Sequence, residues 1–206
     1  MPQLDNKIFL DIETIPVGKD KLAIANDHYK FLIEKKKIND KITEEEFIRD
    51  TALSGDFGQI LCIGFAKNND PVEIISGDEK EMLKNFWIAT GNCDLFIGHN
   101  LMNFDLPFIY KRSIIHGIRP TKDLSFARYR NFPIYDTMCE WNKWSNTSTS
   151  LDKLAKIFDL ESSKQGIDGS QVYDFYLAGK SQEIYDYCKR DVELTRKIYK
   201  RLIFES

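Results

Sequence analysis

The chain lacks any long run of apolar residues, so it offers no segment of the ~20 residues that a membrane-spanning helix needs. The first seven residues show no secretory signal pattern and lead directly into a predicted strand. Histidine is scarce, with three residues in 206, which argues against a histidine-rich zinc site. These absences predict a cytoplasmic protein that has no membrane partner.

Cysteine pairs of the C-x-x-C type are also missing. The four cysteines stand alone among apolar or aromatic neighbours, at Cys62, Cys93, Cys139 and Cys188. Such residues are typical of buried free thiols in a reducing compartment, rather than of zinc ligands or disulfides.

An excess of positive charge is absent as well, since the net charge is −3. This argues against a strongly basic protein that coats nucleic acid. It does not exclude an enzyme that holds one strand end in a narrow, metal-bearing cleft. The carboxylates of such a cleft would account for part of the acidity.

The length and the order of elements predict a single α/β domain over residues 1–206, with 42% hydrophobic and 30% charged residues as in soluble globular proteins. Strands are predicted near 8–12, 60–66, 72–75, 95–97 and 132–135. Helices are predicted near 80–89, 106–116, 150–158, 170–179 and 182–202. A charged, lysine-rich insertion at about 19–57 contains two further predicted helices, of which the second begins at Thr43. This pattern favours a central mixed sheet of five strands flanked by helices.

Three separated motifs place ionisable groups within apolar stretches. They are Phe9–Thr14 (FLDIET), Gly98–Asp105 (GHNLMNFD) and Tyr187–Asp191 (YCKRD). An unpaired buried charge costs several kcal/mol or more, so carboxylates clustered in a core need a strongly positive partner. Hard oxygen ligands of this kind suit Mg²⁺ or Mn²⁺.

The first motif carries two carboxylates on one strand. Strand alternation puts Asp11 and Glu13 on the same face, about 6.5–7 Å apart along the chain. Two carboxylates at this spacing can hold one cation between them. The alternative is an amphipathic strand with a solvated polar face, although Phe9 shares that face.

The last motif lies on a predicted helix. Tyr187 and Asp191 are four residues apart and therefore lie on one face. That face also carries an apolar stripe, formed by Ile184, Cys188, Leu194 and Ile198. An aspartate in such a stripe is unusual, and its alternative explanation is an ion pair with a nearby lysine or arginine.

The middle motif follows a buried strand and brackets Phe104 with Asn100 and Asp105. Taken alone, these residues are typical of a turn or a helix cap. His99, beside them, is interpreted as a structural histidine with no catalytic role.

Taken together, D-x-E-T, N-x-x-x-F-D and Y-x-x-x-D, roughly 90 positions apart, resemble the DEDD superfamily of 3′–5′ exonucleases in its tyrosine subclass. The likeness is greatest to the exonuclease domain of family B DNA polymerases and spans Ile8 to about Leu202. Further matching segments are Ile97–Asn100, Tyr135–Thr137, Leu151–Ile157 and the stretch around Asp191, Val192 and Thr195. The chain departs from that domain in its long charged insertion. No polymerase domain follows, which favours a stand-alone enzyme.

The resemblance implies an RNase H-like fold and two Mg²⁺ or Mn²⁺ ions held by Asp11, Glu13, Asp105 and Asp191. In such a site the ions lie about 3.5–4 Å apart and contact the attacking and leaving oxygens of an in-line displacement. Tyr187 would position the attacking water, because its ordinary pKa of about 10 makes it a poor base.

The resemblance further implies hydrolysis of single-stranded nucleic acid from its 3′ end, with DNA favoured over RNA and nucleoside 5′-monophosphates as products. Thr14, Asn100 and Phe104 would contact the last nucleotides, although Phe104 is equally consistent with the sheet core. A polymerase or a replication or repair factor would be a partner in trans. The lysines at 35–37 are interpreted either as phosphate contacts or as a solvated helix face.

Two other readings remain. A strand followed by D-x-[DE]-x-T also opens the haloacid dehalogenase-like phosphatases, in which the first aspartate is a nucleophile. The chain fits this pattern only in part, because Ile15 stands where threonine is required, and the other two motifs stay unexplained. The second reading is a catalytically silent RNase H-like module that binds nucleic acid or acts as a scaffold. The presence of all four carboxylates and the tyrosine favours an active nuclease.

Overall fold

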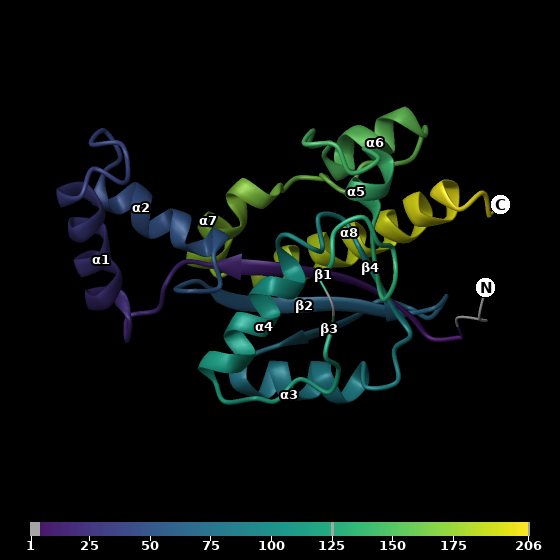
Figure 1. The fold of residues 1–206 in the computed structure, drawn as a ribbon, viewed down its shortest axis with the longest axis horizontal. Helices are drawn as coiled ribbons and strands as arrows, with labels where there is room; N and C mark the ends of the chain where they lie inside the picture. Colours follow the sequence, from purple (N-terminus) through teal and green to yellow (C-terminus); the bar gives the residue numbers. More distant parts are fainter. Residues whose placement is uncertain (1–4, 125, 206) are drawn as a thin grey trace.

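Five strands form one mixed sheet at the centre of the computed structural model, which describes residues 5–124 and 126–205 (Figure 1). The strands are β1 (Lys7–Ile15), β2 (Gln59–Lys67), β3 (Glu73–Ser76), β4 (Leu95–Gly98) and β5 (Ile134–Asp136). Their order across the sheet is β3-β2-β1-β4-β5. The β1–β2 and β2–β3 pairs are antiparallel, whereas β1–β4 and β4–β5 are parallel. The predicted five-stranded mixed sheet is therefore confirmed, and β1 lies at its middle.

The alternation along β1 divides the core between the two faces of the sheet. Ile8, Leu10 and Ile12 pack with α3 (Glu79–Ala89) and α4 (Asp105–Ile115) in the larger apolar cluster. Phe9 faces the opposite side, where its ring lies 5.6 Å from that of Tyr199 on α8 (Ser181–Leu202). Asp11 and Glu13 share the parity of Phe9, so they lie on the face that α8 covers.

Shorter helices support α8 from outside. They are α5 (Thr137–Trp141), α6 (Leu151–Ile157) and α7 (Val172–Leu177), and α6 packs on α8 through Leu154 and Leu194. Helix α5 is missing from the sequence prediction, because five residues are too few to show a helical period. The segment before α7 is a 3₁₀ turn (Gly169–Gln171) capped by Asp168, so the predicted start of a helix at Ser170 is slightly misplaced.

The insertion forms α1 (Leu22–Glu34), α2 (Glu44–Asp50) and a 3₁₀ turn (Thr51–Leu53), which extend beyond the end of β1 in Figure 1. Thr43 and Glu46 form the predicted capping box, with Glu46 N donating to Thr43 Oγ1 over 3.2 Å. The lysines at 35–37 lie in the turn after α1, where Lys36 has a φ of 50°, so the interpretation as a helix face is wrong.

The structure also bears on two expectations from composition, namely the state of the cysteines and the membrane-spanning helices. Cys62, Cys93 and Cys188 are buried free thiols, as predicted, whereas the free thiol of Cys139 is only partly buried. No helix within residues 5–124 and 126–205 is both long and apolar enough to cross a membrane.

Candidate active site

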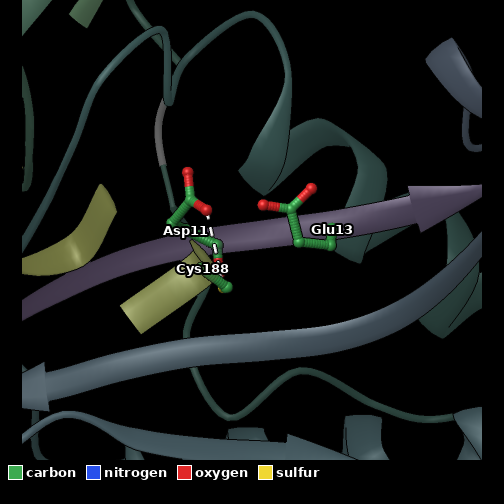
Figure 2. A group of neighbouring side chains, drawn as sticks. All are labelled: Asp11, Glu13 and Cys188. Carbon is green, nitrogen blue, oxygen red and sulfur yellow. Dashed lines mark hydrogen bonds between the residues drawn. The ribbon is translucent and has the colours of Figure 1, made fainter. Parts of the chain in front are cut away.

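The carboxylates of Asp11 and Glu13 lie on the same side of β1 (Figure 2). A carboxylate oxygen of each residue and the sulfur of Cys188 all lie within 4.8 Å of one another. The pairing of β1 with β2 shifts register between Glu13 and Thr14, which indicates a β-bulge directly after the pair. Such bulges redirect side chains next to active sites. The predicted shared face of Asp11 and Glu13 is therefore confirmed.

Helix α8 contributes Tyr187 and Asp191, which are 6% and 7% exposed. They project from the buried face that also carries Ile184 and Ile198. Asp191 makes no ion pair within the described ranges, so the alternative of an ion pair with a lysine or arginine is wrong, although the charges of Arg190 and Lys164 lower its pKa from a greater distance. Its Oδ1 atom is buried and has no hydrogen-bond partner among the described residues.

Helix α4 begins at Asp105, whose carboxylate is 3% exposed and reaches back to β1. Asp105 Oδ1 accepts a hydrogen bond of 3.0 Å from the amide of Ile12. This amide is available because β4 pairs with β1 only over Lys7–Phe9, so Ile12 lies beyond the end of that ladder. This hydrogen bond brings Asp105 to the strand that carries Asp11 and Glu13. A residue that only forms a turn or caps a helix would not need such a contact.

Burial raises the pKa values of all four carboxylates. Burial and the charges of Asp191, Glu13 and Asp105 raise the pKa of Asp11 well above its usual range. Burial is also the first cause for Glu13 and Asp191, and it raises the pKa of Asp105 to about 7. Four carboxylates whose raised pKa values disfavour ionisation form a site that a divalent cation would stabilise.

The donor set fits a hard cation. All four carboxylates offer oxygen, and the unpartnered Asp191 Oδ1 has an open coordination position. The Cys188 thiol is placed differently, because it donates to Asp11 Oδ2 over 3.5 Å. Contact with Cys62 and burial raise the pKa of Cys188, so this sulfur remains a protonated thiol that orients Asp11. The residues present therefore fit Mg²⁺ or Mn²⁺ better than a thiophilic metal.

A cavity of about 550 Å³ opens beside Tyr187 and Asp191. Asn100 and Lys164 also line it. The positive charge of Lys164 opposes the rise in the pKa of Asp191. Sequence reasoning missed Lys164, because it lies in a polar loop without periodicity.

The three residues expected to contact substrate differ in their surroundings. Asn100 faces the cavity and has a φ of 60°, a left-handed conformation that asparagine tolerates. The Thr14 hydroxyl donates to the carbonyl of Ala52 over 2.7 Å, so its proton is already used in a hydrogen bond to the insertion. The Phe104 ring packs against the core, with Phe108 at 5.7 Å, and remains partly exposed.

His99 has two hydrogen-bond partners, Thr137 Oγ1 at 3.0 Å and the carbonyl of Thr149 at 2.8 Å. Burial lowers the pKa of its imidazole, which favours the neutral ring. These contacts agree with its interpretation as a structural histidine, although the residue also lines the cavity beside Tyr187 and Asp191.

The carboxylate of Asp136, at the end of β5, is also buried, and both of its oxygens accept hydrogen bonds. Oδ1 accepts from the amides of Asn100, Met138 and Cys139, and Oδ2 accepts from the amide of Met102. It therefore joins the start of α5 to the loop that carries Asn100. Sequence reasoning did not assign it this role, although an aspartate directly after a strand is a recognised capping signal.

The chain is similar to a known protein family. Residues 60–205 match a family described as a predicted 3′–5′ exonuclease related to the exonuclease domain of PolB. The matched region contains Asn100, Asp105, Tyr187 and Asp191, and it begins after Asp11 and Glu13.

Two polymerases are similar over nearly the whole chain. A DNA polymerase of Archaeoglobus fulgidus is 23% identical over an alignment of 218 residues, which covers 89% of this chain and 27% of the polymerase. The structure of the family B DNA polymerase from Pyrobaculum calidifontis superposes with a TM-score of 0.67 at 16% identity, covering 98% of this chain and 25% of that one. The chain thus spans about a quarter of the length of these relatives. The structural likeness confirms the predicted α/β fold of the RNase H-like type.

Proposed function

Since the chain belongs to the family of predicted 3′–5′ exonucleases related to the exonuclease domain of PolB, we propose that it hydrolyses the terminal phosphodiester at the 3′ end of single-stranded nucleic acid. DNA is preferred over RNA as the substrate, and nucleoside 5′-monophosphates are the products. Residues 1–206 act as one exonuclease domain that carries the charged insertion at about 19–57. A reducing compartment such as the cytoplasm suits its free cysteines.

One observation carries the proposal. Carboxylates from β1, α4 and α8 lie near enough for the charges of Glu13, Asp105 and Asp191 all to act on Asp11, although they come from three distant parts of the sequence. Their burial is unfavourable unless positive charge joins them, and Asp191 Oδ1 lacks any partner among the described residues. We assign Asp11, Glu13, Asp105 and Asp191 to holding two Mg²⁺ or Mn²⁺ ions. Bound there, such ions would activate a water and would stabilise the departing 3′-oxygen.

The side chains around the cluster have separate tasks. Burial and the nearby charges of Asp191, Glu13 and Asp11 raise the pKa of Tyr187, so its hydroxyl keeps its proton. Tyr187 therefore orients the attacking water by hydrogen bonding and does not act as the base. Lys164, on the cavity wall, supplies a cation toward the phosphate, and Asn100 contacts the terminal nucleotide there.

The test is a gel time course on 5′-labelled single-stranded DNA and RNA in Mg²⁺, Mn²⁺ or EDTA. We expect a metal-dependent ladder that shortens from the 3′ end and is lost in Asp11→Ala. Asp20→Ala is the matched control, because Asp20 is exposed and precedes α1. Intact oligonucleotides in every metal lane would contradict the proposal, and binding without hydrolysis would support a silent nucleic-acid-binding module.

A further inference from the structure

The segment after α6 carries Lys164 along one wall of the cavity beside Asp191. Residues 158–168 form turns and bends without a helix or a strand. The Lys164 ammonium makes no ion pair within residues 5–124 and 126–205. A long side chain on irregular backbone loses much conformational entropy when it binds in one position. The use of Lys164 in binding therefore depends on what fixes the backbone around it.

One guanidinium binds the backbone on both sides of Lys164. Arg190 Nε donates to the carbonyl of Ser163 over 2.9 Å, and a terminal nitrogen of Arg190 donates to the carbonyl of Gln165 over 3.4 Å. The planar guanidinium holds several donors in a fixed arrangement, so it can reach two acceptors at once. The two residues next to Lys164 are held in this way, and its own side chain is left on the side of the cavity.

Two further contacts fix the same segment on either side of this point. The Ser162 hydroxyl donates to Asp152 Oδ1 over 2.6 Å, which joins the segment to α6. Ile167 is buried and packs with Tyr187 of α8. Arg190 therefore binds the part of the segment that lies between these two contacts.

Arg190 reaches the segment from the side that faces away from the cavity beside Asp191. It lines a separate cavity of about 280 Å³, together with Lys189. Ser163 lines both cavities, so the segment forms the wall between them. Arg190 is not among the described residues that line the cavity beside Asp191. Its effect on a strand bound there is therefore indirect.

We propose that Arg190 is a positioning residue, which holds the segment so that the Lys164 ammonium faces a phosphate of the strand bound beside Asp191. The inference rests on the proposed exonuclease function, in which Lys164 contacts that phosphate. Arg190 itself touches neither the strand nor the metal ions. Without the guanidinium, the backbone at 163–165 samples more conformations, and the contact between Lys164 and the phosphate costs more entropy.

A double-mutant cycle tests this role through strand binding in EDTA, where no hydrolysis interferes. The probe is a 5′-fluorescein hexathymidylate, whose anisotropy gives the Kd over a series of salt concentrations. We expect Lys164→Met to weaken binding about tenfold, as for the loss of one charged hydrogen bond, and to reduce the log–log salt slope by about 0.7. Arg190→Gln should lose most of the same affinity in the wild type. In the Lys164→Met background it should change the Kd by less than about twofold.

The conservative variant gives a graded result. Arg190→Lys keeps the charge, but a single ammonium does not reproduce the two-point contact of the guanidinium. We therefore expect Arg190→Lys to bind the hexathymidylate with an affinity between those of the wild type and Arg190→Gln. Binding as weak as that of Arg190→Gln would also agree with the two-point contact, whereas full wild-type affinity would show that charge alone is needed and would contradict it.

Hydrogen exchange of the free protein measures the segment itself, without a strand or a metal ion. The Gln165 amide donates to the carbonyl of Ser163 over 2.8 Å, which is the carbonyl that Arg190 also binds. This local bond opens more often once the guanidinium is lost, so we expect the Gln165 amide to exchange about tenfold faster in Arg190→Gln. Lys164→Met should leave this rate near that of the wild type, because Arg190 still binds the backbone.

Two further measurements separate positioning from other effects of Arg190. Lys189→Gln is the matched control, because it removes the neighbouring cation of α8 from the same outer cavity and leaves the guanidinium on the segment. It should leave the exchange rate of Gln165 unchanged. Calorimetry with Mn²⁺ tests an effect through Asp191. Arg190→Gln removes no metal ligand, so the affinity for Mn²⁺ should not fall, and a fall would overturn the assignment of Arg190 to the segment.

The outcomes are separable. If Arg190→Gln weakens binding equally in the wild type and in the Lys164→Met background, Arg190 acts on the strand by another route, such as the Tyr187 ring 6.0 Å from its guanidinium. The positioning role is then wrong, and 3′-end shortening would still support the exonuclease. An unchanged exchange rate at Gln165 would overturn the role as well. If shortening never occurs but the non-additive binding and the faster exchange are present, the positioning role stands and the proposed hydrolysis fails. Circular dichroism confirms that each variant is folded.

Discussion

The amide of Ile12 donates a 3.0 Å hydrogen bond to Asp105, across 93 positions of the sequence. One carboxylate therefore satisfies a backbone donor at the end of the β1–β4 ladder and also adds negative charge to the cluster around Asp11. The structural and the electrostatic parts of this role can be separated by substitution.

Asp105→Asn should keep the hydrogen bond and lose the charge. We expect it to abolish exonuclease activity without loss of thermal stability in EDTA, because its amide oxygen still accepts from Ile12. Asp105→Ala should be about 1 kcal/mol less stable than Asp105→Asn, since the buried amide then lacks a partner. Urea unfolding measures the difference, and equal stability of the two variants would contradict this role.

The stability of the metal-free protein should fall as the pH rises. Burial raises the pKa of Asp105 from 3.8 to about 7, so the folded state binds more protons than the unfolded state between about pH 4 and pH 7. The free energy of unfolding therefore decreases across this window. Urea unfolding in EDTA at pH 5 and pH 8 checks the direction. In Asp105→Asn the free energy of unfolding should decrease less between pH 5 and pH 8 than in the wild type. An equal decrease would show that Asp105 does not cause the pH dependence.

Divalent cations should restore the stability that the metal-free protein loses at pH 8. We expect Mn²⁺ to raise the melting temperature of the wild type, since a ligand present at 100 times its Kd stabilises by about 2.7 kcal/mol. Asp191→Asn should show a much smaller rise, because the unpartnered Oδ1 belongs to the lost carboxylate. Calorimetry with Mn²⁺ gives the affinity directly, and the partly exposed Asp186, which accepts a hydrogen bond from Gln182, provides the matched control, Asp186→Asn. Equal affinities for the wild type and Asp191→Asn would refute the metal assignment.

Tyr187→Phe should slow hydrolysis by roughly 10²-fold, less than the loss of a metal ligand. The ring packs with Ile167, Val172 and Ile184, and phenylalanine keeps these contacts, so stability should change little. Single-turnover assays at saturating Mn²⁺ separate this effect from binding. A loss as large as that of Asp11→Ala would show that Tyr187 does more than orient water.

Asp136→Ala should destabilise the fold by about 3 kcal/mol or more, because four partly buried backbone amides lose their acceptor. Asp123→Ala, at an exposed position before β5, is the control and should be near neutral. Thermal melts compare the two. A small effect of Asp136→Ala would mean that the loop at Asn100 is held by other contacts.

The spacing of residues along the sequence was enough to assign the main site residues to their strand or helix. A two-residue period puts Asp11 beside Glu13, and a four-residue separation puts Tyr187 above Asp191, because these periods follow from backbone geometry. The capping box at Thr43 and the long amphipathic α8 were predictable for the same reason. The motifs in their order also predicted the family.

Only the tertiary structure decided which groups meet. The contact of Asp105 with Ile12, the amides of Asn100 and Met102 on Asp136 and the thiol of Cys188 on Asp11 all join residues that are remote in sequence. The same holds for Lys164 beside Asp191 and for Arg190, which binds the backbone on both sides of Lys164. Periodicity describes one element at a time, whereas these contacts depend on where strands end and how helices pack across the sheet. The sequence by itself therefore determined the elements and the chemistry of their side chains, and the packing of β1, α4 and α8 decided that the charges of Glu13, Asp105 and Asp191 act on Asp11.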